Sequence, residues 1–206
     1  MFYRLALIIC LVCGLGSALA ASEELAATVL RTTGKGKVVL PGGGAGEFKA
    51  GTLLRAGSRV ITEESSLAVL VLEDGSRVNV GPNTDLTIAE LNRDGAKNST
   101  VFELLRGIFK ASVQKLTVGS RFEVKTSDAV AAVKGTEYEV EVTDAGTDAR
   151  VKEGTVWLED PKREHQVIIH EHMTARAGHH GDLGESREMR RDEAERFGAW
   201  RRADDA

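Results

Sequence analysis

The sequence predicts an all-β fold built from many short strands. From Leu25 onward, short runs of alternating apolar and polar residues follow one another, and Gly, Asp and Asn separate them. Alternation with a period of two is typical of a strand that buries one face. No stretch before about residue 183 shows the 3.6-residue period of an amphipathic helix. We therefore expect a single roll or sandwich, or a domain like a double-stranded β-helix.

The alternating runs set the expected order of the strands. Asp74-Gly75 separates two of these runs, and this dipeptide tolerates the positive φ of a tight turn, so we predict a hairpin there. We expect strands near residues 27–32, 37–40, 52–54, 58–62, 67–73, 76–80, 84–91, 100–105, 107–113, 121–126, 129–133, 136–143, 149–153, 155–159, 166–170 and 172–176.

The most strongly patterned stretch runs from residue 122 to 142 and reads FEVKTSDAVAAVKGTEYEVEV. It begins and ends with an alternating run, and in the second run Glu137, Glu139 and Glu141 lie opposite the apolar residues. The Ala/Val run 129–133 between them has no polar face and must be buried. Gly135 follows it, and a glycine inside a strand pattern predicts a bulge or a tight corner.

The same residues resemble a known family. Val124-Lys125-Thr126, the Ala/Val run and the segment VKGTEYEV at 133–140 are similar to the signature of the FecR-type periplasmic domain, named for the ferric citrate regulator. Ser127 stands where the family usually has Pro, and Lys134 where Arg is usual, so the planar guanidinium fork is missing. The resemblance extends more weakly from about residue 29 to 177, and we expect a FecR-like β-domain over 25–180.

The resemblance implies a binding role. In FecR regulators the periplasmic domain contacts the signalling domain of an outer-membrane transducer, and a membrane helix passes the state to a cytoplasmic anti-sigma part. The sequence shows neither of these two parts. The resemblance therefore implies a non-enzymatic binding module without a cofactor. Its expected partner is an envelope protein or a glycan, and its expected role is signal relay. The sequence leaves the oligomeric state open.

The first twenty residues have the pattern of a signal peptide. Arg4 precedes an apolar run, and Ala18-Leu19-Ala20 forms a small-x-small cleavage site. We therefore expect an exported protein, periplasmic or secreted, with no membrane span after cleavage. Both cysteines, Cys10 and Cys13, lie in this segment, so the rest of the chain has no thiol. An alternative is a lipoprotein acylated at one of them, although the bulky residues before each cysteine disfavour that cleavage.

The charge balance argues against nucleic acid as a partner. The whole chain carries a formal net charge of −4, and removal of Arg4 with the signal takes it to −5, with both signs interspersed. Nucleic-acid binding proteins instead concentrate positive charge on one face.

Five histidines lie close together and offer a different function. His170 and His172 would project to the same side of an extended strand, and His165 or the pair His179-His180 would complete a metal shell. The second hypothesis is therefore a metal-binding envelope protein or hydrolase that uses this cluster. A third hypothesis is a structural envelope scaffold.

Two further places are candidates for partner contact. At the corner, Lys134, Gly135 and Glu137 form either a structural Lys134–Glu137 ion pair or a surface for a partner. Trp157 lies opposite Val156 and Leu158 in its alternating run. If Val156 and Leu158 face the core, the indole is exposed and becomes an interface candidate.

The segment 181–206 is highly charged, and we expect a helix near 185–202 or a disordered tail. Its large apolar residues are too widely spaced for a firm apolar stripe. We expect it to dock too weakly to be held firmly, and to present Phe197 and Trp200 as anchors to a partner.

We predict that the exported protein begins at Ala21 and carries no lipid, because the cleavage site Ala18-Leu19-Ala20 follows the apolar run directly. N-terminal sequencing and intact mass of the protein recovered from the periplasm test this. An acylated Cys10 or Cys13, or an uncleaved segment retained in the membrane, would contradict it.

Overall fold

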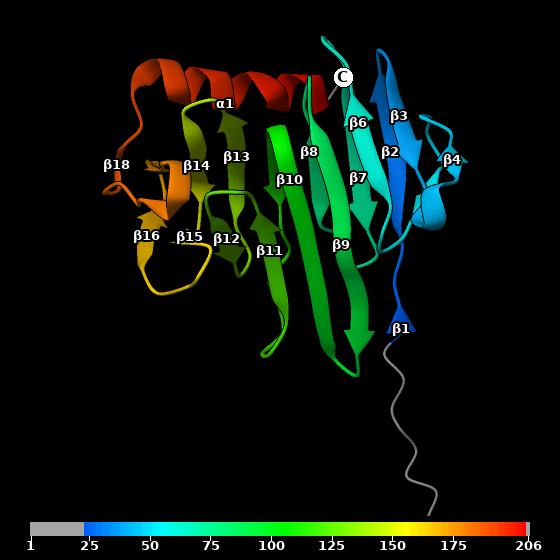
Figure 1. The fold of residues 1–206 in the computed structure, drawn as a ribbon, viewed down its shortest axis with the longest axis horizontal. Coiled ribbons are helices and arrows are strands. Elements are labelled where there is room, and N and C mark those ends of the chain that lie inside the picture. The colour runs from blue at the N-terminus through cyan, green and yellow to red at the C-terminus, as the bar shows by residue number, and fades with distance from the viewer. Residues whose placement is uncertain (1–22, 205–206) are drawn as a thin grey trace, which may run out of the picture.

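The computed structural model describes residues 23–204 and shows two facing β-sheets with one helix, which confirms the all-β prediction (Figure 1). The expected signal peptide, with Cys10 and Cys13, lies outside the described residues, as do the side chains from 199 onward. The facing sheets correspond to the roll or sandwich alternatives. The expected strands are present within a few residues of their predicted bounds. In the described part, no helix is long and apolar enough to cross a membrane.

The first sheet, sheet A, is antiparallel except where β10 and β11 pair in parallel. β1 (Glu23–Glu24) pairs with one end of β9. The strands of sheet A lie in the order β4 (Ala45–Gly46), β3 (Gly36–Val39), β6 (Arg59–Thr62), β9 (Asp85–Asp94), β10 (Lys97–Ser112), β11 (Arg121–Lys125), β12 (Val130–Val133), β15 (Thr155–Glu159) and β16 (Gln166–His170).

The second sheet, sheet B, is antiparallel throughout. It contains the second part of β10, and its strands lie in the order β5 (Leu53–Leu54), β2 (Ala27–Thr33), β7 (Leu67–Leu72), β8 (Arg77–Val80), β10, β13 (Glu137–Thr143), β14 (Gly146–Glu153), β17 (Met173–Ala177) and β18 (Arg187–Glu188). The helices are two 3-10 turns, Pro41–Gly43 and His179–Gly181, and α1 (Arg191–Asp204).

The hydrophobic core lies between the sheets and is centred on four aromatic rings. Phe102 and Phe109 both belong to β10, and their ring centres are 5.2 Å apart. Phe122 from sheet A lies 5.7 Å from Phe102, and Tyr138 from sheet B lies 6.0 Å from Phe109. All four side chains are fully buried. The Tyr138 hydroxyl has no hydrogen-bond partner, and burial raises its pKa well above the ordinary value.

β10 passes from one sheet to the other at Gly107. The sequence predicts two strands, 100–105 and 107–113, whereas the structure shows one strand that turns a corner between them. Gly107 has φ of +90°, and a Cβ atom there would lie 2.5 Å from Thr84 Cα, so only glycine fits without rearrangement. The single glycine therefore turns a predicted break into a continuous strand.

The predicted corner at Gly135 is present. The chain passes there from β12 in sheet A to β13 in sheet B, with φ of +88°. A Cβ atom would approach Lys115 Cα to 3.0 Å. The position thus combines an unfavourable backbone conformation for other residues with a close backbone neighbour.

α1 packs on the outer face of sheet B, across its strands (Figure 1). Beneath it runs a row of register partners, one from each of five neighbouring strands and none more than 7% exposed: Asn79, Lys110, Glu139, Arg150 and Thr174. The fourteen residues of α1 span about 21 Å at 1.5 Å per residue. Five strands spaced about 4.8 Å apart span a similar distance, so the helix matches the row in length.

The N-terminus of α1 is fixed by Glu193. Its carboxylate accepts the backbone N–H of Arg190 at 2.7 Å and two hydrogen bonds from the Arg187 guanidinium at 2.8 and 2.9 Å. The first of these is half of a capping box. The hydrogen bonds from Arg187, with those from Arg190, lower the pKa of Glu193 from 4.5 to about 2.

The structure corrects the start of the C-terminal helix and shows what covers the charged face of β13. Of the two alternatives for the C-terminal segment, it shows the helix, which begins later than residue 185 because Arg187–Glu188 joins β17 as β18. The three glutamates of β13 do lie opposite its core face, but Glu139 is buried beneath α1 rather than exposed. Strand alternation predicts which face a residue occupies, and it gives no information about what covers that face.

We predict that Gly135→Val destabilises the fold by about 1–3 kcal/mol, through backbone strain and contact with Lys115. Urea unfolding of the purified protein measures this. Gly44→Val is the matched control, because Gly44 has an ordinary φ of −63° and only the Leu40 Cβ within 4 Å. Equal midpoints for the two variants would show that Gly135 is a permissive position.

We predict that Glu193 stabilises the protein at neutral pH and that this contribution is lost as pH falls from about 4.5 to about 2. Its folded pKa is lower than its ordinary value, so the unfolded state binds more protons in that range and stability rises with pH. Gln can keep the capping hydrogen bond but carries no charge, so Glu193→Gln removes the charge-assisted pairing with Arg187 and is expected to cost about 1 kcal/mol at pH 7.

The measurement is the free energy of unfolding of both proteins across this pH range, where the difference should shrink towards zero. Glu195→Gln is the control, since Glu195 forms an exposed ion pair with Arg191 and should change stability little. A constant difference between wild type and Glu193→Gln at all pH values would contradict the assignment.

Candidate functional site

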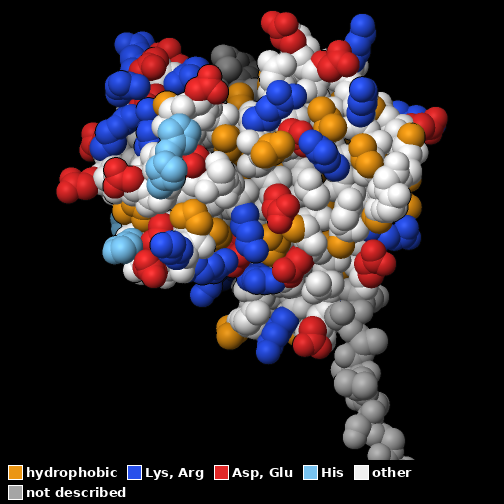
Figure 2. Space-filling view, viewed as in Figure 1, with side chains coloured by type: hydrophobic (Ala, Val, Ile, Leu, Met, Phe, Trp, Pro, Cys, Tyr) orange, Lys and Arg blue, Asp and Glu red, His pale blue; other side chains and the backbone are white. Residues whose placement is uncertain are grey.

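The outer face of sheet A carries the candidate site. Basic, acidic and hydrophobic side chains are interspersed over this side of the molecule (Figure 2). Two hollows lie on it, one on each side of β11: the indole hollow, beside Trp157, and the Arg59 hollow, beside Arg59. Their side chains come from strands that pair in a fixed register, so the sheet holds them in place.

The indole hollow has a volume of about 310 Å³ and is lined by Ser120, Arg121, Phe122, Glu123, Ala132, Val133, Lys134, Trp157, Glu159 and Gln166. Ala132 pairs with Glu123 on one side and with Trp157 on the other. Its small side chain between two large ones leaves the depression. Val156 and Leu158 are fully buried, so Trp157 faces outward and is half-buried. The Lys134 Nζ lies 5.9 Å from the centre of its ring, within cation–π range.

An arginine from the loop after β15 pairs with two carboxylates that line this hollow. Arg163 Nη2 donates to Glu123 Oε2 at 2.7 Å, and Nη1 lies 3.2 Å from Glu159 Oε2. The loop is fixed by Asp160, whose carboxylate accepts the backbone N–H groups of Lys162 and His165. The hydrogen bond to Glu123 raises the pKa of Arg163, so this charge persists at all ordinary pH values. The hollow therefore offers an aromatic face beside fixed charges of both signs.

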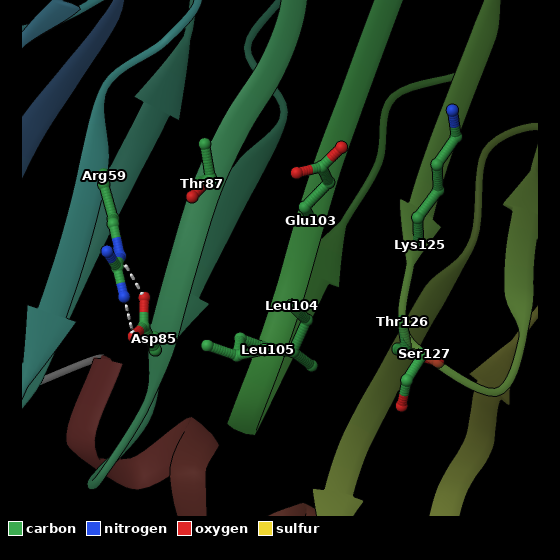
Figure 3. A pocket seen from close by; sticks show the side chains of 9 residues that line it. All are labelled: Arg59, Asp85, Thr87, Glu103, Leu104, Leu105, Lys125, Thr126 and Ser127. Atoms are coloured by element: carbon green, nitrogen blue, oxygen red, sulfur yellow. Dashed lines mark hydrogen bonds and ion pairs between the residues drawn. The ribbon is translucent and has the colours of Figure 1, made fainter. Parts of the chain in front are cut away.

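The Arg59 hollow has a volume of about 490 Å³ and is lined by Arg59, Asp85, Thr87, Glu103, Leu104, Leu105, Lys125, Thr126 and Ser127 (Figure 3). Register pairing places Arg59, Thr87, Glu103 and Lys125 in one row across β6, β9, β10 and β11. Arg59 holds Asp85 with two hydrogen bonds. Leu105 is 67% exposed and, in Figure 3, extends towards Asp85.

These arrangements suit recognition. Both hollows combine an apolar side chain that solvent can reach with charges held by neighbouring strands. Aromatic and arginine side chains carry much of the free energy in many protein interfaces. Electrostatic complementarity around them selects the partner.

The predicted Lys134–Glu137 ion pair is not formed. Lys134 lies over Trp157, whereas Glu137 binds Lys152 at 2.8 Å and lies 3.9 Å from Lys110. The chain turns through Gly135 between the two residues, so their side chains point from different sheets. Lys134 and Trp157 are brought together on sheet A, while Glu137 lies on the outer face of sheet B.

Of the two expected tail anchors, Phe197 is not presented on a free tail. Phe197 is 2% exposed and packs against Lys110, so it can contact a partner only if α1 leaves the sheet. The side chain of Trp200 lies outside the described residues.

The histidines do not form the expected arrangement. His170 ends β16, and His172 lies in the following turn with φ of +63°, so the two do not project from one extended strand. His179 Nε2 donates to the Asp144 carbonyl at 2.8 Å, and this bond, with Asp128, raises the pKa of His179. Within the described part of the chain, no group of three or more His, Cys, Asp or Glu side chains is placed to hold a metal ion.

Sequence reasoning missed the residues of the Arg59 hollow. The alternation in residues 84–91 and 100–105 indicates that Thr87, Glu103 and Leu105 face away from the core. It does not indicate that β6, β9, β10 and β11 are neighbours, because that order depends on pairing between segments far apart in the chain.

Comparison with known proteins supports a family assignment. Residues 58–157 match the family model described as "FecR protein". No curated protein matches the chain. Two crystal structures, at 2.50 and 1.65 Å resolution, of a protein described as a "putative anti-sigma factor" from Parabacteroides distasonis ATCC 8503 have similar folds, with 18% and 19% identity and TM-scores of 0.56 and 0.57.

Each similarity covers 69% of this chain and 63% of the solved chain, so this chain spans somewhat less than two thirds of that protein. At such low identity the likeness shows the fold alone. The family match begins just before β6 and ends within β15, and it includes all the strands around the Arg59 hollow and most of the indole hollow. The chain is therefore similar to the FecR family over residues 58–157, about half of its length.

Proposed function

We propose that this chain is a non-enzymatic, exported binding module, periplasmic or secreted, which recognises an envelope protein through the outer face of sheet A and acts in signal relay. The observation that carries the proposal is the half-buried indole of Trp157, held beside Lys134 and the Glu123–Arg163 pair in an open hollow. Tryptophan and arginine are enriched among the residues that carry most of the binding free energy in protein interfaces. The FecR domain supports a role in signalling.

The solved relatives extend the proposal to regulation. They are described as putative anti-sigma factors, and their chains are longer than the part matched here. The proposal carries over only the general step, in which binding at the domain reports a state to another protein. Control of a particular transcription factor is not part of it.

A glycan is the second candidate ligand, and the composition of the indole hollow favours it. An aromatic face beside carboxylates and the Gln166 amide can stack on a sugar ring and bind its hydroxyl groups. The hollow is also within the lower range of small-ligand sites, which begins at about 300 Å³.

Site-specific photo-cross-linking in intact cells tests the proposal. A photoreactive residue replaces Leu105 or Ile168, two exposed apolar positions, the first in the Arg59 hollow and the second paired with Trp157. Both should cross-link the same protein, and Trp157→Ala should reduce the yield at position 168 about tenfold or more. Leu30, which is 52% exposed on β2 of sheet B and lies two strands away from the row beneath α1, is the control position and should give no such product.

The outcomes separate the candidates. A product that contains saccharide rather than protein would assign the face to a glycan. Equal products at Leu30 and at the two sheet A positions, or no effect of Trp157→Ala, would contradict a partner site on sheet A.

A further inference from the structure

The surface beneath α1 is charged and is complete without the helix. Arg150 Nη1 donates to Glu139 and to Glu141, each at 2.8 Å. Two further pairs, Arg176–Asp148 and Lys152–Glu137, close at 2.8 Å. All these residues belong to sheet B, so none of these pairs uses a side chain of α1. Release of the helix would expose charged groups that water solvates well, rather than an apolar face.

The described part of α1 touches this surface through few groups. Among residues 191–198, only Glu193 and Phe197 are buried. Lys110 Nζ donates to the Phe197 backbone carbonyl at 3.2 Å and lies 4.5 Å from the centre of its ring. One cation on β10 thus contacts both the main chain and the aromatic ring of the helix.

A second cation contacts the helix one turn earlier. Arg187 binds the Glu193 carboxylate with two hydrogen bonds, and it belongs to β18, which pairs with Met173 and Thr174 of β17. Arg187 is therefore held by sheet B and not only by the helix. Lys110 and Arg187 together match a carboxylate and an aromatic residue at positions i and i+4, which share one side of a helix.

The opposing contributions to the free energy of docking allow another segment to replace this helix on sheet B. Within residues 191–198, burial of Phe197 and the hydrogen bonds from Arg187 and Lys110 favour docking, whereas ordering the segment and removing water from buried charges both oppose it. Neither strand pairing nor a continuous apolar stripe ties residues 191–198 to the sheet. A segment with the same two side chains in helical spacing can compete for the same place.

We propose that the row under α1 is an interaction surface which accepts a helical segment of a partner protein, with a carboxylate one turn before an aromatic residue, in exchange for α1. The resident helix is the template for this ligand, since Glu193 and Phe197 have that spacing. The surface lies on sheet B, so the inference does not rest on the function proposed for sheet A. The binding mode is that of an amphipathic helix on a complementary face.

The test uses the whole protein and a synthetic, fluorescently labelled peptide of residues 190–206 as the probe. Phe197→Ala in the protein weakens the resident helix and should bind the peptide at least tenfold more tightly than wild type does. Ala194→Pro, which removes the helical hydrogen bond from Ala194 to Arg190, should do the same by a different route. Fluorescence anisotropy measures both affinities, and circular dichroism verifies that each variant is folded.

Recognition by Lys110 gives a second readout. Adding Lys110→Met to Phe197→Ala should weaken peptide binding at least tenfold, as should a peptide with Ala in place of its Phe. Lys162→Met is the matched control, because Lys162 is an exposed loop lysine, and it should leave the affinity unchanged. The proposal would be overturned if the peptide bound neither helix-weakened protein, or if Lys110→Met left the peptide affinity unchanged.

Sedimentation of the wild-type protein over a range of concentrations tests the nearest alternative. A monomer at all concentrations agrees with a partner protein as the occupant. A dimer that is lost with Lys110→Met would assign the surface to α1 of a second copy and would overturn the choice of a different partner.

Discussion

The passage of β10 through both sheets is the constraint on which the rest of the structure depends. Phe102 and Phe109 leave the same strand on either side of Gly107 and bring the two halves of the aromatic core together. Because sheets A and B share this strand, the register of one sheet is tied to the register of the other. The rows that cross the sheets, and therefore both hollows and the surface under α1, take their register from β10.

The two outer faces differ in how they treat charge. On sheet A, pairs such as Glu123–Arg163 border open hollows and leave Trp157 accessible. On sheet B, Glu139 and Arg150 are covered by a helix, so the same kind of pairing occurs with little water. Burial there raises the pKa of Glu139 even though Arg150 lies beside it. The buried charge of Glu139 therefore opposes folding, whereas Glu193 stabilises the folded protein at neutral pH. The family match contains the central strands of both sheets and excludes α1.

Much of the fold follows from local pattern, and the site follows only in part. Period-two alternation predicts the strands and the outward direction of Trp157, and the glycine between two strand patterns predicts the corner at Gly135. Each of these predictions depends only on residues close together in the sequence. The pairing of Ala132 with Trp157, the row from Arg59 to Lys125 and the position of Lys110 beneath Phe197 all join segments distant in sequence. No local signal marks them. The Lys134–Glu137 pair shows the opposite error, since proximity in sequence does not bring together side chains that a corner separates.

The buried hydroxyl of Tyr138 limits the stability of this protein in alkali. The folded core cannot release that proton at the ordinary pKa of a phenol, whereas the unfolded chain can, so each step above about pH 10 favours unfolding. The only other tyrosine, Tyr3, lies in the segment expected to be cleaved. The ultraviolet absorbance of tyrosinate therefore becomes a direct optical signal for the opening of the aromatic core.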